Sequence, residues 1–371
     1  MGELSSLYIH VPFCTRKCNY CAFESAVPEE GGRELWLTAL EREAELRAQT
    51  TARRPRLATC YIGGGTPTVL SPLHWRRLIQ IIDKFYDFED DAEVTVEANP
   101  NSLRAEHLLE WRDWRVTRVS IGVQSFDDAE LEQMGRLHTG NQAHEAMSAA
   151  LASGFYVSGD FIFGLPGQSF QNWGRTLREA ARCGLHHLSL YQLSIEPGTP
   201  WASLDSAALG DGYAAYRFAQ WYLPQKGYAQ YETANFARPG KESRHNLNYW
   251  REGSYIGLGA GAAGYIDGVR YKNFGALARW AEAVARGELP IESSEELTPA
   301  ARAKEAAVLA LRTTAGIEAA AYAASYGQEA LEALYAKLRK FPDDLCTARD
   351  GRIALSQKGM RVANLIWEEI I

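Results

Sequence analysis

Three cysteines stand close together near the start of the chain, at positions 14, 18 and 21. Three residues separate Cys14 from Cys18, and two separate Cys18 from Cys21. One loop would present all three thiolates, and a cubane iron–sulfur cluster held by three thiolates leaves its fourth iron open to another ligand. The amino and carboxylate groups of an amino acid can chelate such an iron, as the methionine end of S-adenosylmethionine (SAM) would. We therefore predict a [4Fe-4S] cluster on these cysteines, with SAM at the open iron.

A zinc site is the alternative use of the same cysteines. His10 or a distant residue would then complete a shell of four ligands, and the protein would be a zinc-stabilised binding module. The other cysteines, Cys60, Cys183 and Cys346, are scattered singly. In a reducing compartment, a local group of cysteines indicates metal binding rather than disulfide bonds.

The elements that position these cysteines can be predicted from hydrophobic periodicity. Six short apolar stretches, each closed by polar or glycine-rich residues, predict strands at 7–11, 58–62, 93–97, 118–123, 156–163 and 187–193. Segments with helical period lie between them, at 34–49, 72–85, 103–111, 141–153 and 169–182. This alternation predicts an α/β fold, a partial (β/α)6 barrel that is open because a closed barrel has eight units.

Chemically unusual residues follow the ends of the predicted strands, which form the active-site face of βα barrels. The run Gly63-Gly64-Gly65-Thr66-Pro67 lacks side chains at its start, so its backbone N–H groups could approach a ligand closely, or it could be a tight βα turn. Polar groups at or soon after later strands could hydrogen-bond a ribose, an adenine edge or a ligand carboxylate. These are Glu97, Gln124, Arg136 and Asp160. Taken singly, each could equally be a surface or capping residue.

The pattern changes after Pro200. A helix at 212–222 precedes an aromatic-rich stretch at 228–255 and a glycine run at 257–264. From Thr298 onward, Ala- and Leu-rich helices precede a hairpin at 345–355, with its turn at Asp350-Gly351, and a last helix. We therefore predict three parts: a barrel at 1–200, an α+β extension at 201–295 and a small winged-helix-like domain at 296–371.

The cysteine segment carries a resemblance to a known family. Phe13-Cys14-x3-Cys18-x-Tyr20-Cys21 resembles the signature of the radical SAM superfamily, and the segment 8–14 resembles its branch that contains oxygen-independent coproporphyrinogen oxidase. The segments 96–100, 122–126 and 160–166 match family motifs in the same order. The resemblance implies reductive cleavage of SAM to a 5'-deoxyadenosyl radical. It also implies SAM contacts from Tyr8, Tyr20, Gly64, Gly65, Thr66, Glu97, Gln124, Arg136 and Asp160.

Two further features concern the branch of the family. The oxidase pattern has a cysteine two positions after its third ligand, whereas this chain has Phe23 there. The segment 231–250 resembles a block of the HemW heme chaperones, including the motif His245-Asn246-x2-Tyr249-Trp250. In that interpretation His245 ligates heme iron, and Tyr249 and Trp250 offer flat apolar faces to the macrocycle. A buried aromatic cluster with a hydrogen-bonded histidine is the alternative.

Composition limits the partners. A formal net charge of −7 and a pI near 5.7 disfavour nucleic acid, which attracts clustered Lys and Arg. We see no signal peptide and no apolar run long enough to span a membrane, and we expect a cytoplasmic protein.

The resemblance favours a chaperone that binds heme and passes it to an acceptor protein, with a [4Fe-4S] cluster and SAM, and with an electron donor as a further partner. The alternatives are an active radical SAM enzyme, such as a methyltransferase or a porphyrin-modifying enzyme, and the zinc-stabilised module. The sequence leaves open whether the chain catalyses a reaction and which protein accepts the heme.

Overall fold

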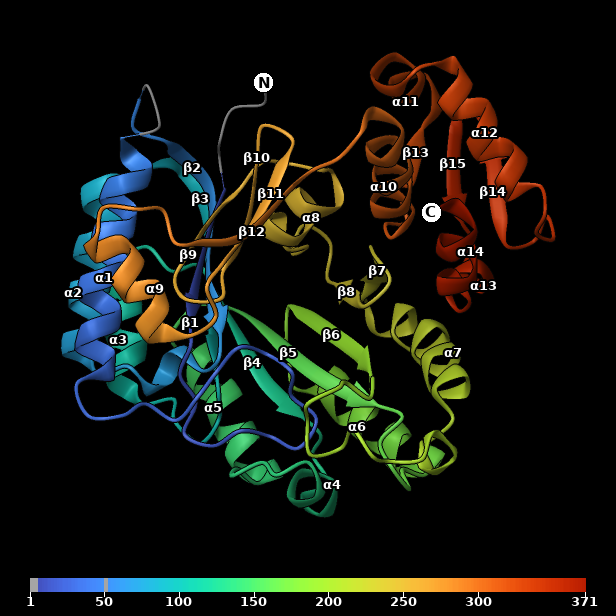
Figure 1. Cartoon of the computed structure of the whole chain (residues 1–371). Coiled ribbons are helices and arrows are strands. Elements are labelled where there is room, and N and C mark those ends of the chain that lie inside the picture. The colour runs from blue at the N-terminus through green and yellow to red at the C-terminus, as the bar shows by residue number, and fades with distance from the viewer. Residues whose placement is uncertain (1–5, 50–52) are drawn as a thin grey trace.

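The predicted strands assemble side by side into one sheet. The computed structural model describes residues 6–49 and 53–371, and its centre is a nine-stranded sheet in the order β7-β8-β6-β5-β4-β3-β2-β1-β9 (Figure 1). Its parallel strands from the βα units are β1 (Ser6–Val11), β2 (Arg56–Gly64), β3 (Asp87–Ala98), β4 (Arg118–Gln124), β5 (Tyr156–Phe163) and β6 (His187–Gln192). All six predicted strands are found, and the partial barrel is confirmed.

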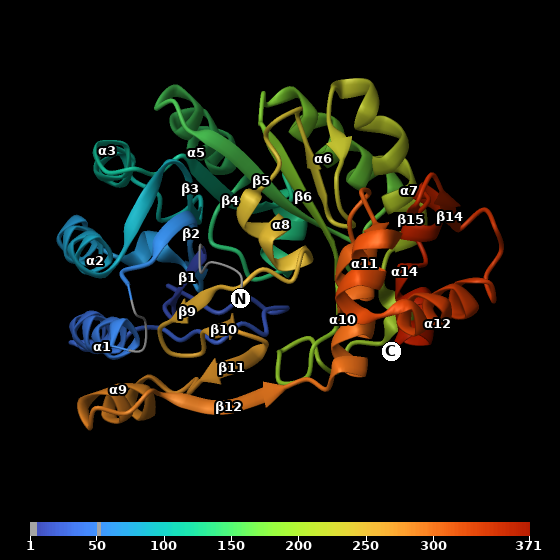
Figure 2. The same ribbon diagram turned by 90° about the horizontal axis from the view of Figure 1, so that it is seen from above.

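Helices connect these strands and cover the outside of the sheet, as Figure 2 shows. They are α1 (Gly32–Ala48), α2 (Pro72–Phe85), α3 (Ala105–Asp113), α4 (Asp128–Gln133), α5 (Gly140–Ala152) and α6 (Phe170–Arg182). The layer between sheet and helices is the apolar core, in which Trp36, Trp75, Trp111 and Trp173 are almost fully buried.

The two faces of the strands differ in polarity, because successive side chains point to opposite sides of a sheet. On β2, Cys60 and Ile62 belong to the apolar core, whereas Thr59 and Tyr61 hydrogen-bond to polar partners from other elements. Each neighbouring strand likewise has a row of polar residues on this face. These rows include Glu93 and Glu97 on β3 and Ser120 on β4. The barrel therefore has a polar interior.

The chain beyond β6 completes the sheet on both of its edges. After α7 (Gly212–Tyr222), strands β7 (Ala229–Gln230) and β8 (Asn235–Ala237) extend it antiparallel beyond β6. The helix α8 (Arg244–Trp250) leads to β9 (Ile256–Leu258), which pairs in parallel with β1. A three-stranded sheet follows, made of β10 (Ala263–Ile266), β11 (Val269–Asn273) and β12 (Ile291–Glu296), with α9 (Leu277–Ala285) before its last strand. The sequence pattern did not predict the strands β7, β8 and β9.

A small C-terminal unit follows, with helices and an antiparallel sheet. It comprises α10 (Pro299–Leu311), β13 (Ile317–Glu318), α11 (Ala319–Tyr326), α12 (Gln328–Leu338), β14 (Cys346–Arg349), β15 (Arg352–Leu355), α13 (Gln357–Met360) and α14 (Ala363–Ile370). Its sheet has the order β13-β15-β14. The predicted hairpin is confirmed, since Asp350 and Gly351 both adopt positive φ between β14 and β15, as a two-residue hairpin turn requires.

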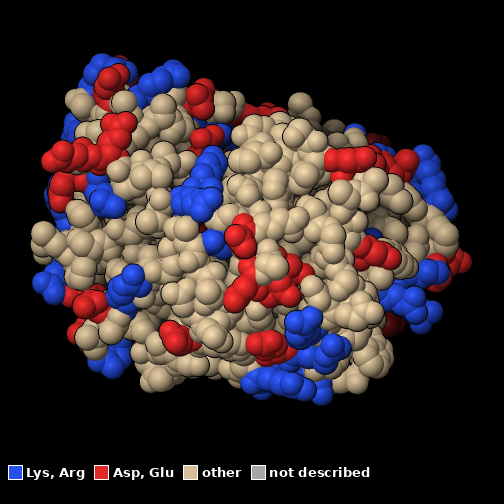
Figure 3. Space-filling model, turned by 90° about the horizontal axis from the view of Figure 1, so that it is seen from below, with Lys and Arg blue, Asp and Glu red and all other residues tan. Residues whose placement is uncertain are grey.

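Two further observations concern the charge of the surface and the length of the helices. Basic and acidic side chains are interspersed with a broad area of other residues on the face shown in Figure 3. In the ranges 6–49 and 53–371, no helix is both long and apolar enough to cross a membrane.

Candidate SAM and cluster site

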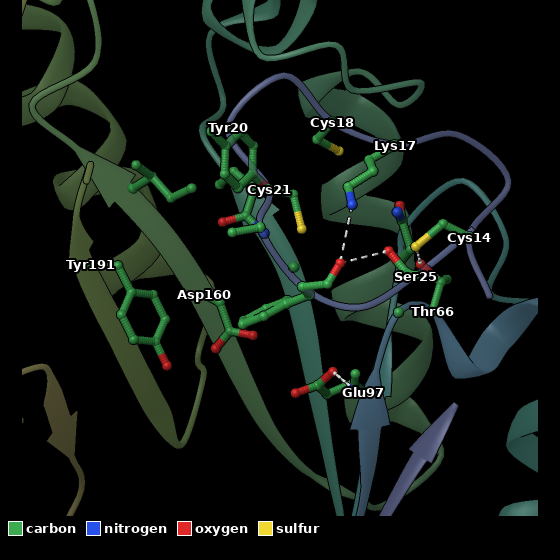
Figure 4. Close-up of a pocket in the computed structure, with 18 of the residues that line it drawn as sticks. Cys14, Lys17, Cys18, Tyr20, Cys21, Ser25, Thr66, Glu97, Asp160 and Tyr191 are labelled. Carbon is green, nitrogen blue, oxygen red and sulfur yellow. Dashed lines mark hydrogen bonds between the residues drawn. The ribbon is translucent and has the colours of Figure 1, made fainter. Parts of the chain in front are cut away.

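The predicted site residues meet in a cavity at the carboxyl ends of the parallel strands. The cavity has a volume of about 510 Å3. Of the predicted residues it is lined by Cys14, Cys18, Tyr20, Cys21, Gly64, Gly65, Thr66, Glu97, Gln124, Arg136 and Asp160. The three cysteines lie on one side, and the carboxyl groups of Glu97 and Asp160 lie on the opposite side (Figure 4). Residues far apart in the sequence thus share one cavity.

The loop that carries the cysteines is held by backbone hydrogen bonds. The Cys14 N–H donates to the Ala26 carbonyl, which joins the two ends of the loop. The Asn19 N–H donates to the Met134 carbonyl at the end of α4, which anchors the middle of the loop. These hydrogen bonds therefore fix the backbone path of the loop that carries the three thiols.

These thiols suit the predicted cluster in their chemistry. All three are free and partly exposed, as cluster ligands need to be before assembly. Burial raises the pKa of the Cys21 thiol, with a further contribution from Cys18 and Cys14. The Arg136 guanidinium lies 3.6 Å from the Cys18 sulfur. Three thiols and one cation around a cavity fit a [4Fe-4S] cluster.

A zinc ion would need a different arrangement, because it gathers its ligands about 2.0–2.3 Å from a single point. Among the residues that the structure describes, no three His, Cys, Asp or Glu side chains form such a group. His10, the proposed fourth ligand, is buried and engages the Glu24 carbonyl and the Tyr8 hydroxyl.

The glycine run after β2 joins strand to loop. The Gly64 N–H donates to a Glu97 carboxylate oxygen at 2.9 Å, the Gly65 N–H to the Val11 carbonyl, and the Thr66 N–H to the Phe13 carbonyl. These N–H groups therefore face protein acceptors, as in a tight βα turn, and the SAM contacts of Gly64, Gly65 and Thr66 stay predictions. Glycine is required for close packing, since a Cβ at Gly65 would lie 2.5 Å from the Phe13 carbonyl oxygen.

Gln124 and Arg136 meet at the end of β4. Gln124 adopts a positive φ of 66°, an uncommon conformation for a residue other than glycine, next to a bulge in the pairing with β5. The Arg136 guanidinium donates to the Gly122 carbonyl at 2.7 Å. Burial alone would lower the pKa of Arg136, but the neighbouring Tyr20 and Cys18 raise it. Backbone strain of this kind is common where a side chain is aimed at a ligand.

The two carboxyl groups of the cavity are perturbed by burial. Burial raises the pKa of Glu97 to about 7, although the Tyr61 hydroxyl, which donates to Glu97 at 2.8 Å, opposes this change. Burial likewise raises the pKa of Asp160 to about 6, against hydrogen bonds from Ser189, Ser120 and other hydroxyls. Both groups are hydrogen-bond acceptors when ionised, and both can change protonation near neutral pH.

Sequence reasoning missed several polar residues of the same cavity. Tyr61, Ser120 and Tyr191 line it from β2, β4 and β6. Tyr61 and Ser120 donate hydrogen bonds to Glu97 and Asp160 respectively. The signal that could have found Tyr61 and Ser120 is alternation, because Tyr61 lies two residues before Gly63 and Ser120 lies four residues before Gln124, on the inward face.

Tyr8 and the predicted heme residues lie elsewhere. Tyr8 contacts His10 and Tyr61, but it is not among the residues that line the cavity. His245 and Tyr249 lie on α8, where the His245 ring is 1% exposed and hydrogen-bonds the Thr59 and Tyr249 hydroxyls, both at 2.7 Å. Burial lowers the pKa of His245 to about 3, which keeps the ring neutral.

Trp250 takes part in a separate contact with the C-terminal unit. The Arg312 guanidinium lies 4.4 Å above the Trp250 ring and 4.7 Å from the Trp367 ring on α14. The buried indole nitrogens of Trp250 and Trp367 have no hydrogen-bond partner among the described residues. The structure thus brings His245 and Tyr249 together, and it directs Trp250 toward the tail.

Comparison with known proteins identifies the family. Residues 8–180 match the model of the radical SAM superfamily, and residues 297–362 match the HemN C-terminal domain. Superfamily membership implies a [4Fe-4S] cluster and SAM as cofactors.

Full-length relatives agree with these models. A protein named heme chaperone HemW from Bacillus subtilis (strain 168) is 35% identical over 91% of this chain and 90% of its own length. One of the same name from Mycobacterium tuberculosis (strain H37Rv) is 35% identical over 100% of this chain and 95% of its own length. The solved structure of coproporphyrinogen III oxidase (HemN) from Escherichia coli has the same fold, with a TM-score of 0.87 at 22% identity over 100% of this chain and 90% of that one. The chain therefore belongs to the HemW family within the radical SAM superfamily.

Proposed function

We propose that this protein binds heme and transfers it to an acceptor protein, while carrying a [4Fe-4S] cluster and SAM. The observation that carries the proposal is identity near 35% to proteins named heme chaperone HemW over almost the whole chain. The cavity supports the cofactor part, because it combines three cysteines with polar residues from several strands. Phe23, in place of a further cysteine, favours a chaperone over a coproporphyrinogen oxidase.

The cofactor roles follow from the positions of the side chains. Cys14, Cys18 and Cys21 would hold the cluster, which when reduced supplies an electron to SAM. The ionised carboxylates of Glu97 and Asp160 would accept hydrogen bonds from hydroxyl or ammonium groups of SAM. The remaining contacts that the resemblance implies would come from Tyr8, Tyr20, Gly64, Gly65, Thr66, Gln124 and Arg136.

The heme site remains proposed at His245, Tyr249 and Trp250. The support is the resemblance of the segment 231–250 and the neutral imidazole of His245, the form that ligates iron. Ligation would require one His245 nitrogen to leave its present hydroxyl partner, so α8 would have to shift on heme binding.

The proposal includes the organisation and the surroundings of the protein. We propose a barrel at 1–200, an extension at 201–295 that supplies the heme motif, and a winged-helix-like domain at 296–371. An electron donor would reduce the cluster, and the heme acceptor is a second protein. The grouped, unpaired cysteines support action in a reducing compartment such as the cytoplasm.

A second candidate is an active radical SAM enzyme. The observation that favours it is the reach of the cavity, which extends from the cysteines to Tyr191 and Glu196, beyond the residues matched to SAM contacts. A substrate next to SAM would occupy that region.

Two assays on anaerobically reconstituted protein test the proposal. Titration with heme, followed by absorbance, should saturate at one heme per chain, and the loaded protein should pass heme to an apo heme protein. SAM cleavage should then be measured with and without heme or coproporphyrinogen. Absence of saturable heme binding, together with multiple-turnover SAM cleavage on a porphyrin substrate, would replace the chaperone with the enzyme.

A further inference from the structure

The helix that carries the heme motif closes the base of the barrel. Figure 2 shows α8 near the middle of the ring of strands and helices. The backbone N–H of His245 donates to the Glu93 carboxylate at 3.0 Å. Glu93 is near the beginning of the row of β3 side chains that point into the barrel. The buried Arg118 on β4 pairs with the same Glu93 and donates to the Lys241 and Glu242 carbonyls. The motif is therefore fastened to strands that also line the cavity.

The His245 ring has a fixed orientation. Its two nitrogens face the Thr59 hydroxyl and the Tyr249 hydroxyl, each at 2.7 Å, and the side chain is excluded from solvent. Two short hydrogen bonds on opposite sides of a neutral ring leave it little rotational freedom. The ring is thus a rigid surface inside the barrel.

That surface supports Tyr61. The rings of His245 and Tyr61 are stacked, with centroids 5.2 Å apart and planes inclined by 27°. The Tyr61 hydroxyl donates to the Glu97 carboxylate at 2.8 Å, and the other Glu97 oxygen accepts from the Gly64 N–H at 2.9 Å. A continuous chain of contacts therefore runs from His245 through Tyr61 to Glu97, which lines the cavity.

We infer that His245 is a positioning residue for the SAM cavity, because it holds the Tyr61 ring in place and, through Tyr61, the Glu97 carboxylate. The inference rests on the proposed binding of SAM in the cavity and goes beyond it by including the motif helix in that site. It assigns to His245 a role that does not depend on iron ligation.

The protonation of Glu97 gives this role a specific signature. The titratable groups that face Glu97 are Tyr8 on β1, Tyr61 on β2, Asp160 on β5, Tyr191 on β6 and Tyr249 on α8. Of these, the Tyr61 hydroxyl lowers the pKa of Glu97 by its hydrogen bond, whereas Asp160 raises it. A displaced Tyr61 would therefore raise the pKa of Glu97. As the pH is lowered, Glu97 would then be protonated at a higher pH, and SAM binding would begin to weaken at that higher pH.

The test is the dissociation constant for SAM, measured against pH on reconstituted protein. We expect His245→Ala and Tyr61→Phe each to weaken SAM binding about tenfold, the effect of one hydrogen bond to a charged group, and to move the pH midpoint upward. His245→Gln, which keeps a flat polar side chain, should recover most of the affinity. Arg244→Ala is the control, because Arg244 is the adjacent residue of α8 and contacts Asp91 at the surface.

The outcomes separate this inference from the proposed function. Wild-type protein that does not bind SAM would overturn the proposed function and the inference with it. If the wild-type protein binds SAM and folded His245→Ala has the same dissociation constant and the same pH midpoint, the inference is overturned and the proposed function stands. If His245→Ala does not fold, Tyr61→Phe decides, because it keeps the stacked ring and removes the hydroxyl only, and wild-type behaviour in Tyr61→Phe would contradict the inference.

Discussion

Replacement of Glu43 by Ala should destabilise the protein strongly, because this buried carboxylate joins four parts of the chain. Glu43 lies on α1 and is fully buried. One oxygen accepts from the Arg47 guanidinium at 3.1 Å and from the Asn273 amide at 2.7 Å. The other accepts from the Gly259 N–H and the Trp280 indole, both at 2.9 Å. These donors come from α1, the end of β9, β11 and α9.

The magnitude follows from these contacts. Removing one partner of a buried ion pair costs about 3–5 kcal/mol, and each buried donor that loses its acceptor adds about 1 kcal/mol or more. With three further donors besides Arg47, we therefore expect a loss of about 6–8 kcal/mol for Glu43→Ala, a large part of the ~5–15 kcal/mol typical of a folded protein. Since β9 pairs with β1, which leads into the cysteine loop, the change should also loosen the cluster site.

Urea unfolding followed by circular dichroism measures this loss. With a denaturant slope of about 1–3 kcal/mol/M, the midpoint should fall by about 2 M or more. Glu45→Ala is the matched control, because Glu45 lies two residues further along α1 and forms an exposed ion pair with Arg42 that is worth at most about 1 kcal/mol. Equal midpoints for Glu43→Ala and Glu45→Ala would refute the reasoning.

Four further predictions concern the cofactors. Cys14→Ser, Cys18→Ser or Cys21→Ser should each remove the intact cluster, as iron and sulfide analysis would show, whereas Cys183→Ser and Cys346→Ser should retain wild-type amounts. SAM affinity should fall as the pH drops from about 8 to about 6, because Glu97, with its pKa raised to about 7, loses an acceptor on protonation; Glu97→Gln should flatten this profile. With Phe23 in place of a cysteine, the reduced protein should not convert coproporphyrinogen III to protoporphyrinogen IX, and formation of that product would disprove this. Because His245 cannot keep both hydroxyl partners while ligating iron, saturating heme should raise the dissociation constant for SAM, and an unchanged constant would place the heme ligand elsewhere.

Local sequence signals predicted much of the fold. The strand from Tyr156 to Phe163 and the helix from Pro72 to Phe85 have the predicted bounds, because their apolar period is regular and their ends carry turn or capping residues. The cysteine spacing and the polar residues at strand ends led to the cavity for the same reason, since parallel strands bring their carboxyl ends to one edge.

Long-range contacts account for what was missed. The strand β9 has only three residues, Ile256–Leu258, within a glycine run, and it exists because β1 has a free edge there. Glu43 would be expected on the surface of its helix, since an isolated glutamate is rarely buried. Its burial depends on donors that lie more than two hundred residues away in sequence, such as Asn273 and Trp280.

The heme motif shows the same limit. The residue types of the motif indicated aromatic rings for a macrocycle and a histidine ligand for iron. The sequence could not reveal that His245 would stack on Tyr61 inside the barrel. That contact depends on the pairing of β2 with its neighbours and on the path of the chain from β8 to α8. Alternation along β2 places Thr59 and Tyr61 on the same face, and this was the available clue.

The central claim is a [4Fe-4S] cluster on Cys14, Cys18 and Cys21 whose open iron binds SAM. Electron paramagnetic resonance of the reduced, anaerobically reconstituted protein during a SAM titration tests it most directly, because a new ligand on one iron alters the spectrum of the cluster. We predict a [4Fe-4S] signal that changes with added SAM and saturates at one SAM per chain. A cluster signal that SAM leaves unchanged, or the same signal in Cys18→Ser, would contradict the account.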